Sequence, residues 1–121
     1  MNKLPNIEYN GWTNYETWRL NLEYFNGSAF IYRQDVKQWL KECEDYDNKQ
    51  TLSNGVYDYL QNLLAKCLRQ SLNTYVDDNC KNDFLKGLLR SFVSDVNYHE
   101  IAKHILEEIL EELELDYELA V

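Results

Sequence analysis

The sequence NYHEIAKHILEEILEEL, residues 97–113, carries apolar side chains at intervals of three and four positions. This spacing places them on one side of an α-helix, because a helix completes a turn in about 3.6 residues. Asn97 followed by Glu100 matches a capping box with asparagine as the cap, which predicts the start of the helix. We expect this helix to reach about residue 115, with a wide apolar face of Ile101, Ala102, Ile105, Leu106, Ile109, Leu110 and Leu113.

Four earlier segments show the same helical periodicity. They run from a capping box at Thr13-x-x-Glu16 to Asn26-Gly27, over 28–45, over about 55–75, and from a cap at Asn82 or Asp83 to Val93. Residues 1–12 precede them as an extended lead. One proline and four glycines are few helix breakers for 121 residues, and no segment alternates convincingly as a strand would. The sequence therefore predicts an all-α fold, a bundle of about five helices forming one domain over residues 1–121.

The cysteines and the N-terminus bear on the compartment. Cys43, Cys67 and Cys80 are odd in number and contain no C-x-x-C pair. No apolar run has the length of a signal peptide core or of a membrane span. We expect reduced thiols in a cytoplasm and no membrane partner.

The net charge of −9 is concentrated at one end of the chain. Seven carboxylates lie within residues 107–118, and residues 107–121 contain no lysine or arginine, so the remainder of the chain carries only −2. Nucleic acids and anionic membranes repel such an excess, which argues against direct binding to either.

The acidic C-terminal end, residues 107–121, provides the first candidate binding surface. On a continuous helix its glutamates would fall on one face, and their charge density would approach that of duplex DNA in order of magnitude. An ordinary solubilising tail explains the same charges equally well. The predicted acidic face consists of Glu107, Glu108, Glu111, Glu114 and Glu118.

Aromatic residues provide a second candidate surface. Tyrosine and tryptophan are enriched in interfaces, and Tyr9, Trp12 and Tyr15 cluster in the opening segment. An aromatic stripe at helical spacing is more often part of a core. The first helix carries such a stripe in Tyr15, Trp18, Leu22 and Phe25.

No pattern of catalytic or metal-binding residues stands out. His99 and His104 are five residues apart, whereas two zinc ligands on one helix face need a spacing of four. Cys43 has acidic neighbours that raise a thiol pKa, and Cys67 lies on an apolar stripe. Phosphate-binding glycine loops and the nucleophile elbow are absent from the sequence. We expect neither an enzyme nor a cofactor.

Two stretches resemble a known group of small proteins. The segment YNGWTNYETW, residues 9–18, resembles the "TNYETW" opening of small proteins encoded by bacteriophages and other mobile elements. The segment SDVNYHEIAKHIL, residues 94–106, resembles their "VNWxEIAxHLL" ending, with Tyr98 where tryptophan is commoner. Residues 27–92 do not align. The resemblance implies a mobile-element origin and a bacterial host cytoplasm, but it supplies no catalytic or binding residues, because the group is mostly uncharacterised.

These observations lead to three functional hypotheses. The first is a counter-defence inhibitor of the anti-CRISPR or anti-restriction type, whose acidic face occupies the basic nucleic-acid groove of a host protein or ribonucleoprotein complex. The second is an adaptor or host-takeover protein that binds a host enzyme through its Tyr/Trp surface. The third is a small metal-dependent hydrolase. A homodimer formed through the wide apolar face of the last helix is also left open.

Overall fold

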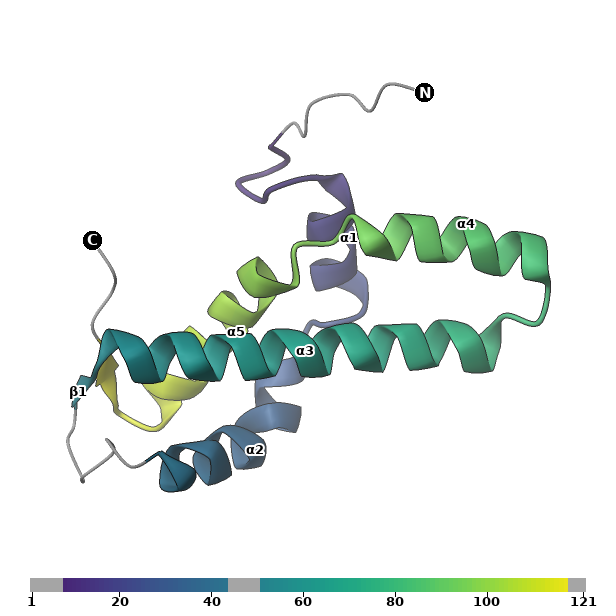
Figure 1. Ribbon diagram of the computed structural model, residues 1–121. Coiled ribbons are helices and arrows are strands. Elements are labelled where there is room, and N and C mark those ends of the chain that lie inside the picture. Colours follow the sequence, from purple (N-terminus) through teal and green to yellow (C-terminus); the bar gives the residue numbers. More distant parts are fainter. Residues whose placement is uncertain (1–7, 44–50, 118–121) are drawn as a thin grey trace.

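The computed structural model describes residues 8–43 and 51–117, and it confirms the all-α bundle. Figure 1 shows how its elements are arranged. The elements are α1 (Tyr15–Glu23), α2 (Ser28–Glu42), β1 (Thr51–Leu52), α3 (Asn54–Asn79), α4 (Asp83–Ser94), α5 (Tyr98–Glu112) and β2 (Asp116–Tyr117).

Helix α3 is the longest element, and the other helices are organised around it. Its 26 residues extend about 39 Å at 1.5 Å per residue. Helix α5 makes its most extensive contact with α3, and α2 packs against both (Figure 1). The centre of the core contains Val36, Leu60, Leu64, Leu68, Ile101, Ala102, Leu106, Ile109 and Leu110, each with an exposed fraction of 0%.

The predicted apolar face of the last helix is therefore the inner wall of the bundle. Ile101, Ile105 and Leu110 are buried against α2 and α3. This face is covered within the chain itself.

A short backbone pairing joins the segment before α3 to the segment after α5. β1 and β2 run parallel, with Thr51 opposite Asp116 and Leu52 opposite Tyr117. This two-stranded pairing has two residues in each strand, so the all-α fold class is unchanged. Leu52 is 2% exposed, which anchors this end of the bundle to the core.

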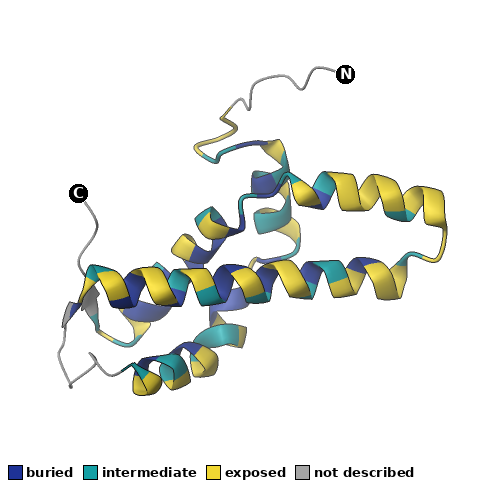
Figure 2. Cartoon of the chain, in the orientation of Figure 1, coloured by how far each residue is buried: buried dark blue, intermediate teal, exposed yellow. Residues whose placement is uncertain are grey.

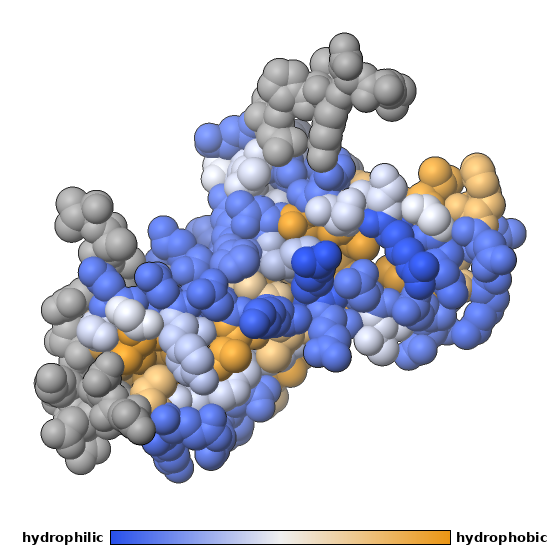
Figure 3. Space-filling model, viewed as in Figure 1, coloured by the Kyte–Doolittle hydropathy of each residue, from blue (hydrophilic) through white to orange (hydrophobic). Residues whose placement is uncertain are grey.

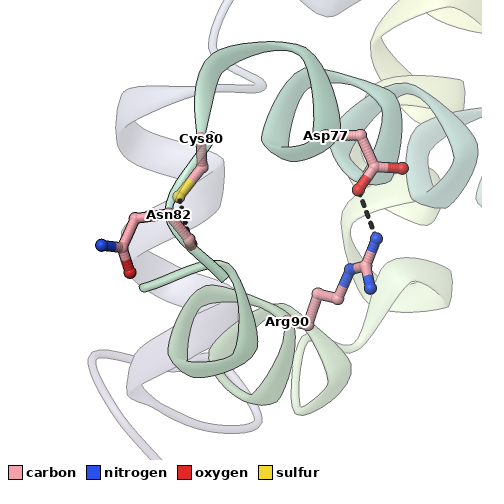
Figure 4. A network of polar contacts seen from close by, with 4 residues as sticks. All are labelled: Asp77, Cys80, Asn82 and Arg90. Carbon is pink, nitrogen blue, oxygen red and sulfur yellow. Dashed lines mark hydrogen bonds and ion pairs between the residues drawn. The ribbon is translucent and has the colours of Figure 1, made fainter. Parts of the chain in front are cut away.

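Helix α4 and the second half of α3 form an antiparallel hairpin, which we call the α3–α4 arm (Figure 1). Near the turn, the Cys80 thiol donates to the carbonyl of Asn82 at 3.6 Å, and Arg90 pairs with Asp77 (Figure 4). The hydrogen bond from Arg90 is the main reason that the pKa of Asp77 lies below its ordinary value. Figure 2 shows that α4 is exposed over most of its surface.

The structure corrects the predicted start of the first helix. Thr13 is not the cap; Asn14 is, and its side-chain oxygen accepts from the Thr17 amide at 2.9 Å. The Thr13 amide instead donates to the carboxylate of Glu100, a residue 87 positions away. A contact between distant segments has therefore moved the cap by one residue.

The inward face of α1 also differs from the predicted one. Thr17 is fully buried, whereas Leu22 is 51% exposed and Tyr15 is 38% exposed. Of the predicted stripe, only Phe25, beyond the end of the helix, is buried. The apolar stripe of α1 therefore lies mostly at the surface, because polar contacts with the start of α5 orient the helix.

Candidate functional site

The helical part of the acidic end lies on the last two turns of α5. Glu108, Glu111 and Glu112 are exposed there, while Glu107 is half-buried and accepts a hydrogen bond from the Tyr57 hydroxyl at 3.4 Å. Among the described residues, no ion pair involves these four glutamates. The carboxylates of Glu108, Glu111 and Glu112 therefore point into solvent, and that of Glu107 points toward α3.

The predicted helical face does not continue beyond Glu112. Leu113 is the C-cap, and Glu114 adopts a left-handed conformation with φ of 57°. The Glu114 amide bonds to the Glu111 carbonyl at 3.1 Å and the Leu115 amide to the Leu110 carbonyl at 2.9 Å, which together make a Schellman motif. Glu114 is thus exposed but off the helix, and Glu118 lies outside the described residues.

The helix end and the left-handed turn where the acidic end lies are unfavourable positions for glutamate side chains. The carboxyl end of a helix carries a partial negative charge, so cations are favoured there, yet the last turn of α5 contains no basic residue. Glycine usually occupies the left-handed position that Glu114 fills, because a Cβ is strained there. Glu108, Glu111, Glu112 and Glu114 are the carboxylates of the acidic end that the structure shows exposed to solvent.

The predicted aromatic residues separate into two groups. Tyr9 and Tyr15 meet edge to face at 5.2 Å between ring centroids, and Trp18 lies 4.8 Å from Tyr9. Phe92 of α4 completes this aromatic cluster at 6.4 Å from Tyr15. Tyr9 and Tyr15 are each 38% exposed, so the cluster offers part of its aromatic area to solvent.

Trp12 belongs to a different site. The turn that precedes it is closed by reciprocal backbone bonds between Tyr9 and Trp12, both 2.8 Å, with Asn10 and Gly11 at φ of 47° and 84°. Positive φ at both central positions suits an Asn-Gly pair. The turn places the Trp12 ring 4.4 Å from that of His104 on α5.

A small cavity of about 140 Å³ opens beside this Trp12–His104 pair. Its lining includes Asn21, Asn26 and Glu108. The structure thus brings one predicted aromatic residue, Trp12, next to one residue of the acidic end, Glu108, while Tyr9 and Tyr15 lie elsewhere.

The two stretches that carry the family resemblance meet at a polar junction, the cap junction, formed by Thr13, Asn14, Thr17, Asn97 and Glu100. The Thr17 hydroxyl donates to the Asn14 side chain at 2.6 Å and accepts from the Asn97 amide at 2.8 Å. The Asn97 side chain donates to the Thr13 hydroxyl at 3.0 Å and caps α5 through the Glu100 amide, also at 3.0 Å. The Asn14 amide group donates to the Asp95 carbonyl at 2.8 Å.

The cap junction assigns a structural role to these motif residues. Each polar group satisfies a helix terminus or another member of the junction, and Asn14 and Thr17 are 5% and 0% exposed. The interpretation that both stretches are capped helix starts is correct, although the first cap is Asn14. The sequence did not indicate that these two helix starts are hydrogen-bonded to each other.

A second groove, of about 480 Å³, lies between α3 and the start of α5. Lys66 and Arg69 line one side, and His99 lines the other. His99 contacts the Asn62 side chain through Nε2 at 2.9 Å. Lys66 and Arg69 bring positive charge to this groove. Both residues are far from the acidic end in the sequence.

The histidines and thiols have separate surroundings. His99 meets Asn62, and His104 meets Trp12, so the two rings do not converge. Across residues 8–43 and 51–117, no group of three potential ligands lies close enough to bind a metal ion. Burial, and secondarily the charge of Asp35, raises the pKa of the Cys67 thiol, which keeps it protonated and weakly nucleophilic.

Sequence reasoning missed one surface, the apolar face of α4. Phe84 is 74% exposed, Leu85 50%, Leu88 55% and Leu89 43%. Part of this surface is the apolar patch at the tip of the arm in Figure 3. The periodicity predicted a helix here, but nothing in the sequence indicated that its apolar side chains are uncovered.

Within the described part of the chain, none of the helices combines the length and hydropathy that a bilayer span requires. No family model, curated protein or solved structure matches this chain.

Proposed function

We propose that this protein is a phage or mobile-element counter-defence inhibitor, of the anti-CRISPR or anti-restriction type, which acts in the host cytoplasm. Its acidic end would occupy the basic nucleic-acid groove of a host protein or ribonucleoprotein complex. The resemblance of residues 9–18 and 94–106 to mobile-element proteins supports the origin. The exposure of Glu108, Glu111 and Glu112 supports the mechanism.

The observation that carries the proposal is the unfavourable placement of the acidic end. Glutamates at a helix carboxyl terminus oppose the helix dipole, and like charges at i and i+4, as in Glu108 and Glu112, each destabilise a helix by about 0.2–0.5 kcal/mol. Glu114 adds a left-handed residue with a side chain. Solubility alone would be served by carboxylates at less unfavourable positions, so a binding role explains these positions better.

The mechanism requires electrostatic attraction to a basic groove. Opposite charges accelerate association, and their effect weakens as salt rises. The complex should therefore form at low salt and dissociate at high salt, without a metal or cofactor.

The experiment begins with capture of the tagged protein's partners from a bacterial lysate at low salt, followed by elution at high salt. The double substitution Glu111→Lys/Glu112→Lys should abolish capture of a nucleic-acid-handling complex. It should leave thermal stability equal or higher, because lysine suits a helix carboxyl end.

A matched control changes the net charge equally at other sites. Asp35→Lys/Asp78→Lys replaces two exposed acids on α2 and α3 and should retain capture. Equal loss in both double variants would assign the effect to net charge and refute the groove mechanism. A wild-type protein that retains no nucleic-acid-handling complex would refute the proposal itself.

One observation favours the second candidate function, an adaptor that binds a host enzyme. The aromatic cluster exposes Tyr9 and Tyr15 beside Phe92, and partly exposed aromatic side chains are frequent anchors in interfaces. A partner held through this cluster would resist high salt and would be lost on Tyr9→Ser/Tyr15→Ser substitution.

A further inference from the structure

We propose that a second copy of this chain covers the exposed apolar face of α4, forming a two-fold dimer through the tips of the α3–α4 arms. This inference is independent of the proposed function. It rests on the area of the face, its lack of charge and an unexplained glycine.

The face is wide and continuous. At 100° per residue, Phe84, Leu88 and Phe92 form its central row, and Leu85 and Leu89 flank this row. Four of these five side chains are between 43% and 74% exposed. A soluble chain rarely leaves so many large apolar side chains together on one helix without a partner.

The area suits a modest dimer. The four exposed side chains leave about 400 Å² of apolar surface in water per copy, taking aromatic side chains as about 200 Å² and leucines as slightly smaller. Two copies would bury about 800 Å² of apolar area, or about 1,200 Å² in total if two thirds of the contact is apolar. That value lies at the lower limit for specific, stable interfaces, so the dimer should depend on concentration.

The charge distribution permits self-association at this place. The charged residues of α4, Asp83, Lys86 and Arg90, fall on the side of the helix opposite the apolar face. Residues 77–94 contain three acidic and three basic residues, so the arm is locally neutral in a chain of net charge −9. A two-fold contact here brings no like charges together.

The acidic ends would remain far apart in such a dimer. Tyr57, which contacts Glu107, and Asp78, near the tip of the arm, are 21 residues apart on α3, or about 31 Å. This distance exceeds the screening length of about 8 Å at physiological salt. Repulsion between the two anionic ends is therefore weak across an α4–α4 contact.

Gly87 gives an independent reason to place another helix here. A glycine inside a helix destabilises it by about 1 kcal/mol relative to alanine. Gly87 has an ordinary helical φ, and a Cβ built at this position would meet no atom within 4 Å. Nothing within the described chain requires glycine, whereas close approach of a second helix does. Gly87 and Ser91 border the apolar face one turn apart.

Sedimentation equilibrium over a wide concentration range tests the dimer. Wild-type protein should dimerise reversibly, and added salt should not weaken the association. Leu88→Glu should weaken dimerisation at least tenfold with an unchanged helical circular dichroism spectrum, since Leu88 is 55% exposed in the monomer. Gly87→Ala should raise the unfolding temperature of dilute protein and still weaken dimerisation.

A matched control separates this face from general stickiness. Phe30 on α2 is 84% exposed, and Phe30→Glu should leave the dimer intact. Loss of the dimer in Phe30→Glu but not in Leu88→Glu would overturn the assignment to α4. A wild-type protein that stays monomeric at high concentration would also overturn it and would assign the face to a different protein partner.

Discussion

Thr17 shows how a single hydroxyl joins two distant parts of this chain. It donates to Asn14 at the start of α1 and accepts from the Asn97 amide 80 residues away, with no exposure to water. No helical propensity favours threonine here, since a β-branched side chain is a mediocre helix former. The hydroxyl satisfies polar groups of two helix starts at once, the buried Asn14 and the half-buried Asn97.

Replacing Thr17 with valine should therefore destabilise the fold strongly. Thr17→Val keeps the shape but removes the buried hydrogen bond to Asn14 and leaves the half-buried Asn97 amide without its acceptor, and an unsatisfied buried group costs about 1–3 kcal/mol. We expect a loss of about 2–3 kcal/mol in urea unfolding at neutral pH. Thr17→Ser retains the hydroxyl and should lose less. Equal stability of Thr17→Val and wild type would mean that the cap junction does not hold the two helices together.

Tyr98 predicts how stability changes in alkali. Its hydroxyl donates to the Val93 carbonyl at 2.7 Å, and burial raises the pKa of Tyr98 to about 12, against an ordinary value of 10.0. The folded state holds the Tyr98 proton more tightly than the unfolded state does. The protonated hydroxyl therefore stabilises the fold fully below pH 10. This stabilisation is lost as pH rises from 10 to 12, by up to about 2 kcal/mol.

Tyr98→Phe isolates this effect. The variant should lose about 1 kcal/mol at neutral pH with the hydrogen bond. It should then show a flatter decline in chemical-denaturation stability between pH 10 and 12. If stability declines in parallel in the two proteins, the alkaline sensitivity belongs to other groups. Tyr32 is one of them, because burial also raises its pKa.

At the scale of elements, the apolar periodicity of the later helices was sufficient to predict them. The pattern located α3, α4 and α5; the predicted cap of α5, Asn97, is correct, and of the two caps considered for α4 the structure selects Asn82. These features are local, because a cap and an apolar stripe depend on neighbours within one or two turns. The all-α class followed from them.

The errors arose where long-range contacts or backbone geometry override the local pattern. The orientation of α1 depends on residues near position 97, which its own sequence cannot reveal. The end of α5 depends on a left-handed Glu114, and no glycine or proline marks that stop. An amphipathic pattern also identifies an apolar face without telling whether the chain covers it, so the exposure of α4 was not predictable.

The candidate site was predicted only in its composition. The carboxylates at positions 108, 111 and 112 are exposed, but the helix that was to align them with Glu114 ends at Glu112. Glu107 turns toward Tyr57 instead. Of the two predicted sets, Trp12 and Glu108 line one cavity, because the Asn10-Gly11 turn directs Trp12 toward α5.

For the whole molecule, the structure predicts an uneven distribution of local stability. α5 is buried along one entire face between α2 and α3, whereas Val93 is the buried residue of α4. Segments with few buried contacts open at lower free energy than the core.

Amide hydrogen exchange on dilute protein should reveal this difference. We expect the amides of α4 to exchange at least about 100-fold faster than those of Ile105–Leu110, since a difference of roughly 3 kcal/mol in opening free energy separates them. Raising the protein concentration should slow exchange in α4 selectively if the arms dimerise. Uniform protection of α4 and α5 in dilute protein would contradict the view of the arm as a weakly held hairpin.

The cap junction also has a consequence for synthesis on the ribosome. The groups that hold the start of α1 belong to Asn97 and Glu100, 80 to 87 positions later in the chain. While the residues between α1 and Asn97 are being translated, α1 has none of these partners available. The bundle can therefore close only after α5 has left the exit tunnel, when both motifs are present together.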